Sequence, residues 1–138
     1  MINKELDDAW RDCVRLMYGG RCARCTWLGG GAESCVDDTH HILSRGAFPQ
    51  YKHHPANGLP LCRPCHDYAG IFTRYFLCEL ADFAPDVYDT IAEMRKDRGY
   101  RHTDEGDSSL IQQYVEMYRK QYRISSDPRP QPTGPLVR

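Results

Sequence analysis

The sequence predicts a mostly helical α+β domain with a metal-stapled centre. Apolar residues recur at three- and four-residue spacing over residues 3–17 and over much of residues 66–122, a periodicity typical of amphipathic helices. Residues 33–42 and 59–61 have strand character, and one Cys-x-x-Cys pair precedes these two segments while a second follows them. At 138 residues the chain provides one domain, and a small, loop-rich domain gains stability from a bound metal.

The first helix and the loops after it are marked by a capping residue, glycines and prolines. Asn3 can cap a helix over residues 3–17, and Gly19-Gly20 is expected to end it. The apolar face of this helix consists of Leu6, Trp10, Cys13, Val14 and Met17. Residues 21–32 hold the first cysteine pair and a glycine-rich connection. Residues 43–56, with two prolines and no periodicity, are expected to form a long loop.

Three further helices are expected after the second cysteine pair. The first runs over residues 66–80, and its single apolar face is expected to contain Tyr68, Ile71, Phe72, Tyr75, Phe76 and Leu80. Pro85 suits the first turn of the next helix, which is expected to stop near Gly99. Asp107 or Ser108 can cap the last helix.

The chain therefore divides into four parts that differ in charge. They are an N-terminal helix packed on the core (1–20), a central core (21–80), a helical C-terminal extension (81–124) and a proline-rich flexible tail (125–138). The net charge of the whole chain is −1, which gives no general attraction to polyanions. Residues 21–74 nevertheless carry a net +2, with six basic and four acidic side chains, so the core is a surface that a polyanion could approach.

The N-terminal residues give no sign of export or membrane insertion. No apolar run follows the charged residues there, which argues against a secretory signal peptide. No stretch of the sequence approaches the ~18 consecutive apolar residues of a membrane-spanning helix. We therefore expect a cytoplasmic protein without membrane contacts, whose cysteines bind metal in preference to forming disulfides.

The two cysteine pairs have the spacing of a structural zinc (Zn2+) site. Each pair places two thiolates on one side of a metal, and two pairs complete the tetrahedron that zinc prefers. The four expected ligands are Cys22, Cys25, Cys62 and Cys65. Because 36 residues separate the pairs, a substructure is expected between them. The alternative of a redox-active Cys-x-x-Cys is less favoured, since that chemistry needs only one pair. The other cysteines, Cys13, Cys35 and Cys78, are expected in the core.

An adjacent histidine pair, His40-His41, ends the first predicted strand. Neighbouring residues of a strand point to opposite faces, so the two side chains suit different tasks unless the strand bends. A neutral imidazole can accept a proton from water near neutral pH, and it can also bind a divalent metal. Such a pair is often incidental on its own, so its functional interpretation depends on the order of the surrounding residues.

The order of these residues resembles the HNH nuclease family with its ββα-metal fold. The resemblance covers about residues 21–80, and it rests on His40-His41-Ile42, Asn57 and Leu61-Cys62-Arg63-Pro64-Cys65-His66, together with the first cysteine pair. It implies that His41 is the general base, that Asn57 holds and orients the loop that carries the base, and that His40 and His66 bind a divalent cation. Many family members carry Asp at the position of His40. An imidazole there favours transition metals, so Mn2+ or Ni2+ is expected to serve as well as Mg2+.

The resemblance implies single-metal hydrolysis of DNA. A water deprotonated by His41 would attack phosphorus, and the cation would stabilise the transition state and the departing 3′ oxygen, leaving 5′ phosphates. Side chains expected to position phosphates are Arg45, Lys52, Arg63 and Arg74. No catalytic role falls on the loop residues His53 and His54, which are expected to contact phosphate or to be exposed. His102 is expected at the surface. Asp37 or Asp38 could support the metal site from a second shell, although solvated acids are the favoured interpretation.

Two further interpretations stay open. A non-catalytic zinc-knuckle module that binds DNA would share the cysteines and leave the histidines incidental. A toxin or restriction nuclease on the same scaffold is the weaker of the two. Within the nuclease interpretation, the size of the chain and its added helices also resemble small phage-encoded nucleases. A homodimer could form through the face of the last helix that contains Tyr114, Met117, Tyr118 and Tyr122, although packing within one chain is the favoured interpretation.

Overall fold

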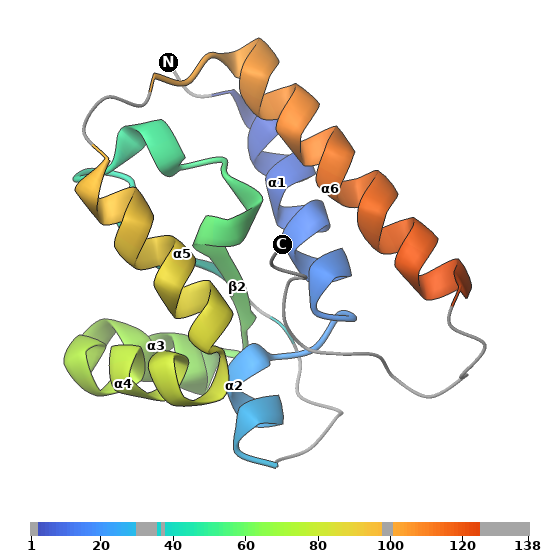
Figure 1. Cartoon of the computed structure of the whole chain (residues 1–138). Helices are drawn as coiled ribbons and strands as arrows, with labels where there is room; N and C mark the ends of the chain where they lie inside the picture. The colour runs from blue at the N-terminus through green and yellow to red at the C-terminus, as the bar shows by residue number, and fades with distance from the viewer. Residues whose placement is uncertain (1–2, 30–35, 37, 98–100, 125–138) are drawn as a thin grey trace.

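The computed structural model describes residues 3–29, 36, 38–97 and 101–124 (Figure 1). Several expectations from the sequence lie outside these described residues, among them the start of the strand at residues 33–35 and the helix end near Gly99. Others concern single residues and the tail. They are the core position of Cys35, the solvated state of Asp37 and the flexible tail at residues 125–138.

The described chain is mostly helical and contains a two-stranded antiparallel sheet, which confirms the predicted α+β class. The elements in chain order are α1 (Lys4–Met17), α2 (Ala23–Trp27), β1 (Asp38–His41), the 3-10 turns η1 (Pro49–Tyr51) and η2 (Pro55–Asn57), β2 (Gly58–Leu61), α3 (Arg63–Ile71), α4 (Thr73–Phe83), α5 (Pro85–Lys96) and α6 (Asp104–Ile124). Both predicted strands, the N-terminal helix and the helix at Pro85 are therefore present.

α1 begins and ends where the sequence predicts. The Asn3 side chain caps the helix by accepting a hydrogen bond of 3.0 Å from the Leu6 amide. Gly19 and Gly20 have φ angles of 65° and 74°, a left-handed conformation that glycine adopts without strain and that ends the helix. The predicted apolar face is buried, and it consists of Leu6, Trp10, Cys13, Val14 and Met17.

β1 and β2 pair as an antiparallel hairpin in which His40 lies opposite Leu59 and His41 lies opposite Gly58. Every residue of β2 is buried, because α1, α2 and α3 all contact this strand. In Figure 1, α3 and α4 lie below the hairpin and α1 lies to its right. The hairpin therefore has one face toward α1 and another toward α3, and this arrangement separates the two members of the histidine pair.

The prediction of a single helix over residues 66–80 is wrong. The segment forms two helices, because Phe72 leaves helical geometry with φ −112° and ψ 51°. This break interrupts the helical period, so one apolar face does not continue across it. Of the expected face, Phe76 and Leu80 are buried, whereas Ile71, Phe72 and Tyr75 are exposed. Cys78 is also exposed, which contradicts its expected core position, while Cys13 is buried as expected.

α6 begins earlier than the sequence predicts. The Thr103 hydroxyl accepts a hydrogen bond of 2.9 Å from the Gly106 amide, which is the pattern of a helix N-cap. Asp107 is 1% exposed and lies inside the helix, and Ser108 follows it there, so the expectation that one of them caps α6 is wrong.

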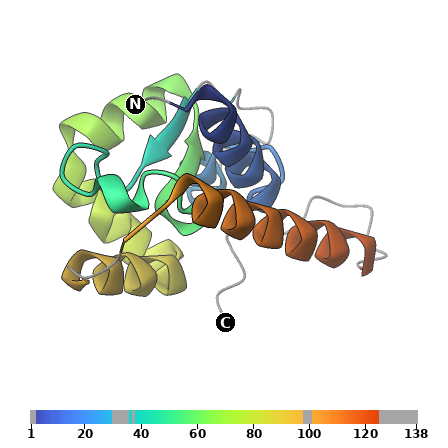
Figure 2. The same ribbon diagram turned by 90° about the horizontal axis from the view of Figure 1, so that it is seen from above.

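α6 packs along α1, and Figure 2 shows the two helices side by side from above. Tyr118 is buried, and the Tyr122 hydroxyl donates a hydrogen bond of 2.7 Å to the Leu16 carbonyl. Two of the aromatic residues considered for a dimer surface, Tyr118 and Tyr122, thus make contacts within the chain. A homodimer stays a prediction.

The loop between the strands is packed against the helices, and this overturns the expected exposure of its histidines. His53 is 2% exposed, and His54 is half-buried with its Nδ1 accepting a hydrogen bond of 3.1 Å from the Ala56 amide. The loop is compact because η1 and η2 fold it back on itself. His102 is also half-buried, with its Nδ1 2.9 Å from a carboxylate oxygen of Asp107.

Candidate functional site

The four predicted zinc ligands come together in one cluster. Their sulfur atoms all lie within 4.8 Å of one another, and the Sγ atom of Cys25 is 3.7 Å from those of Cys62 and Cys65. A tetrahedral zinc ion with sulfur ligands at about 2.3 Å separates its sulfurs by roughly 3.8 Å, so the spacing fits zinc. The cluster can therefore hold a metal ion such as zinc, as the sequence predicts.

Local geometry prepares both cysteine pairs for a metal. Cys22 is the N-cap of α2, and its sulfur accepts a hydrogen bond of 3.4 Å from the Cys25 amide. Cys62 is the N-cap of α3, which places Cys65 in the first turn of that helix. Burial raises the pKa of the Cys22 and Cys65 thiols. Four thiolates at this distance consequently need a bound cation to offset their charge.

Arg24, for which no role was predicted, lies beside the cysteine cluster. Its Nη1 is 3.8 Å from the Cys65 sulfur, and its guanidinium carbon lies 3.7 Å from the centre of the Tyr68 ring. Arg24 also donates two hydrogen bonds to the Glu79 carboxylate, at 2.6 and 3.1 Å, which raise the pKa of Arg24. A zinc ion with four thiolates carries a net negative charge, so Arg24 offsets that charge and attaches the cluster to α4. Its place between the cysteines of Cys22-Ala23-Arg24-Cys25 was the available signal.

His40 and His41 point to opposite faces of the hairpin, as regular strand geometry predicts. The His40 ring faces α3 and α4, with its centre 5.4 Å from the His66 ring and 5.6 Å from the Phe76 ring. The His41 ring faces α1 and stacks on Trp10. The structure thus brings together the two predicted catalytic-metal ligands and places the predicted base on the other face.

Asp38 is a third polar residue beside His40 and His66. It lies on the same face of β1 as His40, and its Oδ2 is 3.8 Å from the His66 Nδ1 and 3.6 Å from the Arg63 guanidinium. This oxygen is buried without a hydrogen-bond partner, while the Asp38 side chain as a whole is 31% exposed, so the acid is only partly solvated. The signal in the sequence was its two-residue spacing from His40 on a predicted strand.

The possible ligand atoms of Asp38, His40 and His66 are less closely grouped than the four cysteine sulfurs. Among the described residues, the four cysteines form a group of possible ligands whose atoms all lie within 4.8 Å of one another, and His40, His66 and Asp38 do not form such a group. A cation held by His40 and His66 would therefore draw the side chains closer together. Burial, with a smaller effect from His66 and His41, lowers the pKa of His40 to about 4, so its imidazole is neutral and able to bind a metal at neutral pH.

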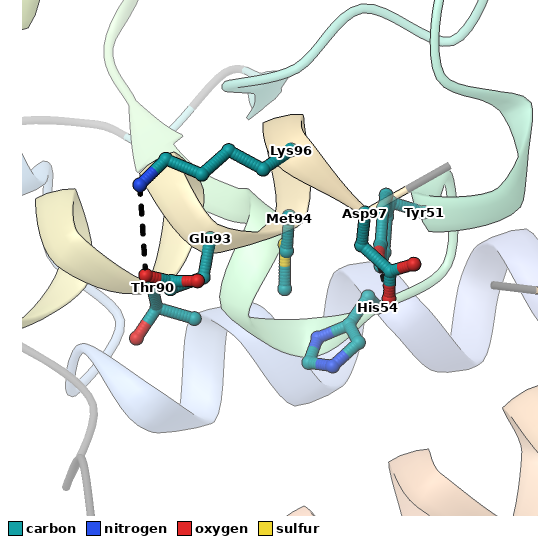
Figure 3. Close-up of a pocket in the computed structure, with 7 residues that line it drawn as sticks. All are labelled: Tyr51, His54, Thr90, Glu93, Met94, Lys96 and Asp97. Atoms are coloured by element: carbon teal, nitrogen blue, oxygen red, sulfur yellow. Dashed lines mark hydrogen bonds and ion pairs between the residues drawn. The ribbon is translucent and has the colours of Figure 1, made fainter. Parts of the chain in front are cut away.

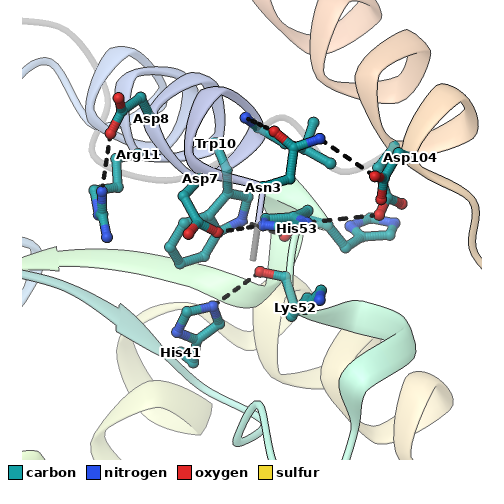
Figure 4. Close-up of polar contacts among 12 residues, drawn as sticks. Asn3, Asp7, Asp8, Trp10, Arg11, His41, Lys52, His53 and Asp104 are labelled. Atoms are coloured by element: carbon teal, nitrogen blue, oxygen red, sulfur yellow. Dashed lines mark hydrogen bonds and ion pairs between the residues drawn. The ribbon is translucent and has the colours of Figure 1, made fainter. Parts of the chain in front are cut away.

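The His41 imidazole is held by a backbone carbonyl. Its Nε2 lies 2.8 Å from the Lys52 oxygen (Figure 4). A carbonyl only accepts hydrogen bonds, so Nε2 carries the proton and Nδ1 keeps its lone pair. Burial lowers the pKa of His41 to about 4, the Lys52 hydrogen bond opposes this shift, and the charge of Arg45 adds to it. His41 is consequently a neutral imidazole with a fixed tautomer at neutral pH.

Asn57 fastens the two ends of the loop that carries Lys52. It is fully buried, and its Oδ1 accepts a hydrogen bond of 2.7 Å from the Leu43 amide. Its Nδ2 donates to the carbonyls of Leu43 and Tyr51, both at 3.1 Å. One amide side chain therefore makes three hydrogen bonds to the backbone and holds the loop closed.

The four basic residues expected to contact phosphate take different positions. Arg63 is exposed in the first turn of α3 beside Asp38, and Arg45 is exposed in the loop, near enough to influence the charge of His41. Lys52 is partly exposed, and its carbonyl is the group that contacts His41. Arg74 is exposed near the start of α4. Arg45, Lys52 and Arg63 thus flank the histidines, whereas Arg74 follows the break between α3 and α4.

A pocket of about 560 Å³ lies between the loop and α5 (Figure 3). Its lining includes Tyr51, whose hydroxyl donates a hydrogen bond of 3.3 Å to Asp97, and His54. Lys96 and Glu93 form an ion pair of 3.9 Å at its rim. The polar groups of this pocket thus contact one another and attach the loop to α5, and the lining residues do not include His40 or His66.

Comparison with family models, with curated proteins and with solved structures finds no match to this chain. Among the helices of the described residues, none is long and apolar enough to cross a membrane. The function must therefore be argued from the chemistry of the site.

Proposed function

We propose that the protein is a metal-dependent HNH endonuclease that hydrolyses DNA phosphodiester bonds. The observation that supports this proposal is the hairpin followed directly by α3, with His40 and His66 together on one face of this unit and His41 on the other face. His40 and His66 face each other across this unit, and His41 is oriented by a loop that Asn57 closes. A zinc ion on the four cysteines would hold the hairpin and α3 to α2.

His41 would act as the general base. Its Nδ1 lone pair is available because Nε2 donates to the Lys52 carbonyl. Hydrolysis needs a group that takes a proton from the attacking water, and a neutral imidazole in a fixed orientation does this without first losing a proton of its own. His41 thus supplies the proton acceptor, and the carbonyl supplies its orientation.

His40 and His66 would hold the divalent cation, with Asp38 close enough to join them. Two imidazoles alone neutralise none of the charge of the cation, and the Asp38 oxygen that lacks a hydrogen-bond partner would supply negative charge. Nitrogen ligands favour Mn2+ or Ni2+, and the carboxylate also suits Mg2+. When bound, such a cation stabilises negative charge on the scissile phosphate. Arg45, Lys52 and Arg63 would hold the neighbouring phosphates of the DNA.

A non-catalytic zinc-knuckle module that binds DNA is the second candidate, and one observation favours it. The His41 ring stacks on Trp10, and the His40 ring packs edge-on against Phe76. Histidines with aromatic neighbours and shielded surfaces are also found as purely structural residues. In that case the zinc cluster would organise a binding surface, and the histidines would only fill space.

Nicking of supercoiled plasmid DNA distinguishes the two candidates. The zinc-loaded protein would be freed of loosely bound metal and then supplied with Mg2+, Mn2+ or Ni2+ in turn. Nuclease function predicts cleavage that requires added metal, leaves 5′ phosphates and disappears in His41→Ala, while DNA binding persists. Gln113→Ala, on the exposed side of α6, serves as the control that retains activity. Binding without cleavage for every ion would reject the nuclease and favour the module.

A further inference from the structure

A buried polar cluster connects α1, the loop and α6 on the His41 side of the hairpin (Figure 4). His53 lies at its centre, with its Nε2 hydrogen-bonded to the Asp7 carboxylate at 2.5 Å. Its Nδ1 is 3.8 Å from the Asp107 carboxylate, beyond hydrogen-bond distance, and is buried without a hydrogen-bond partner. His53 and Asp107 are 2% and 1% exposed. The Nδ1 of His102 is 2.9 Å from the same Asp107 oxygen. We call Asp7, His53, Asp107 and His102 the His53 clamp.

The clamp holds the part of the loop that orients His41. Lys52, whose carbonyl oxygen is 2.8 Å from the His41 Nε2, directly precedes His53. The next residue is also attached to α1, because the Trp10 indole donates a hydrogen bond of 2.9 Å to the His54 carbonyl. Three consecutive loop residues, Lys52 to His54, are therefore held by hydrogen bonds to His41 on one side and to α1 on the other, with Asp107 of α6 3.8 Å from His53.

A cluster of this kind is a costly way to attach a helix. Burial by itself raises the pKa of Asp7, but the hydrogen bond and charge of His53, with Arg45 and Arg11, hold that pKa below its usual value. Asp7 is therefore ionised at neutral pH. Apolar residues of similar volume often stabilise a fold as well as a buried ion pair does. The hydrogen bonds of the cluster instead fix the orientation of its side chains, because a hydrogen bond restricts the angle and position of the groups that it joins.

We infer that His53 is a positioning residue for His41, and that it acts by holding the Lys52 carbonyl at the His41 Nε2. The inference rests on the proposed function for its catalytic meaning. If the carbonyl moves away, the His41 proton can pass to Nδ1, or the ring can turn, and either change removes the lone pair from its fixed direction. α6 contributes through the charge of the Asp107 carboxylate, which lies 3.8 Å from the His53 Nδ1.

The first test reads the His41 ring directly and does not depend on cleavage. The full-length, zinc-loaded protein would be labelled with nitrogen-15, and the tautomer of each histidine would be read from its ring nitrogen shifts, with His41 identified by its loss in His41→Ala. Wild type should show His41 protonated only at Nε2. His53→Leu should show mixed tautomers or a shifted ring, and His53→Gln, which retains a donor for Asp7, should restore part of the wild-type signal.

Asp107→Asn provides a second variant in case His53→Leu does not fold, because it weakens the clamp without removing the His53 side chain. Asp104→Ala is the matched control. It removes another polar contact between the N-terminal end of α1 and α6, the 3.2 Å hydrogen bond from the Asn3 cap, and leaves His53 in place. His41 nitrogen shifts that stay at wild-type values in folded Asp107→Asn and His53→Gln would overturn the inference.

Kinetics then separate the inference from the proposed function. Displacement of a base by about 1 Å costs up to roughly 100-fold in rate. We expect kcat for plasmid nicking to fall 10- to 100-fold in Asp107→Asn with little change in KM, and Asp104→Ala to match wild type. Cleavage by wild type with unchanged kcat in Asp107→Asn would reject the positioning role and leave the nuclease intact. Altered His41 tautomers without cleavage by any protein would support the positioning role and reject the nuclease.

Discussion

Trp10 stacks on His41, with ring centres 4.2 Å apart and an angle of 13° between the ring planes. The contact is possible because Gly58, which pairs with His41 across the hairpin, has no side chain. A Cβ atom at Gly58 would lie 2.7 Å from both Trp10 Cζ2 and Val14 Cγ2. The packing of α1 on the candidate base therefore depends on a glycine in the neighbouring strand.

Gly58→Ala should destabilise the protein, because Trp10 and Val14 are buried and can yield only by moving α1 away from β2. Overpacking of a core in this way costs about 1–3 kcal/mol. Gly70→Ala is the matched control, since a Cβ at this helical position meets no described atom within 4 Å. We expect that control to leave stability unchanged or to raise it by roughly 0.5–1 kcal/mol. Urea unfolding of both variants measures this, and equal stability of the two would contradict the close packing.

The cysteine cluster predicts one tightly bound zinc per chain. Cys25→Ser removes a ligand from the centre of the cluster, so we expect zinc to be lost and the thermal transition to broaden or disappear. A structural zinc site contributes on the order of 10 kcal/mol to folding. Cys78→Ser is the control, because Cys78 is exposed and lies in α4 away from the cluster. Metal analysis by mass spectrometry together with thermal unfolding gives both quantities, and zinc retained at full occupancy in Cys25→Ser would reject this ligand set.

His54 should make stability depend on pH. Burial lowers the pKa of His54 from 6.5 to about 4, so between these values the unfolded chain binds a proton that the folded chain does not. Stability from this group is therefore present above pH 6.5 and is lost as the pH falls toward 4. Between pH 7 and pH 5 the loss is about 2 kcal/mol.

His54→Asn isolates that contribution, because asparagine can still accept a hydrogen bond from the Ala56 amide but does not titrate. Protonation of the cysteines affects both proteins alike and cancels in the comparison. We expect wild type to lose about 2 kcal/mol more than the variant between pH 7 and pH 5, measured by urea unfolding. Parallel stability profiles would show that His54 is solvated in solution.

The features that could be predicted from the sequence are those fixed by neighbouring residues. Asn3 and Gly19-Gly20 set the ends of α1 through local hydrogen bonds and backbone conformation, and both strands and the cysteine cluster follow from spacing. The opposite directions of His40 and His41 follow from the strand period alone. In each case a few consecutive residues determine the geometry.

The missed features depend on residues that are distant in the sequence. His53 looks like a solvated loop residue until α6 brings Asp107 beside it, and Asp38 looks solvated until α3 places His66 there. The break at Phe72 has no proline or glycine at that position to mark it, and the periodicity continues through it in the sequence. Long-range packing therefore decided burial at these positions and overrode local polarity.

Asp38 offers the sharpest test of the proposed catalytic metal. If its carboxylate joins His40 and His66, Asp38→Asn should weaken binding of Mn2+ at that site by roughly 10- to 100-fold, because the variant loses the negative charge. Asp67→Asn, an exposed acid in the same helix as His66, is the control and should bind as wild type does. Isothermal titration of the zinc-loaded proteins with Mn2+ measures the affinities independently of cleavage. Equal affinities for wild type and Asp38→Asn would show that Asp38 is not a ligand and pairs only with Arg63. Binding of Mn2+ that is weak in Asp38→Asn and absent in His66→Ala would establish Asp38, His40 and His66 as one site.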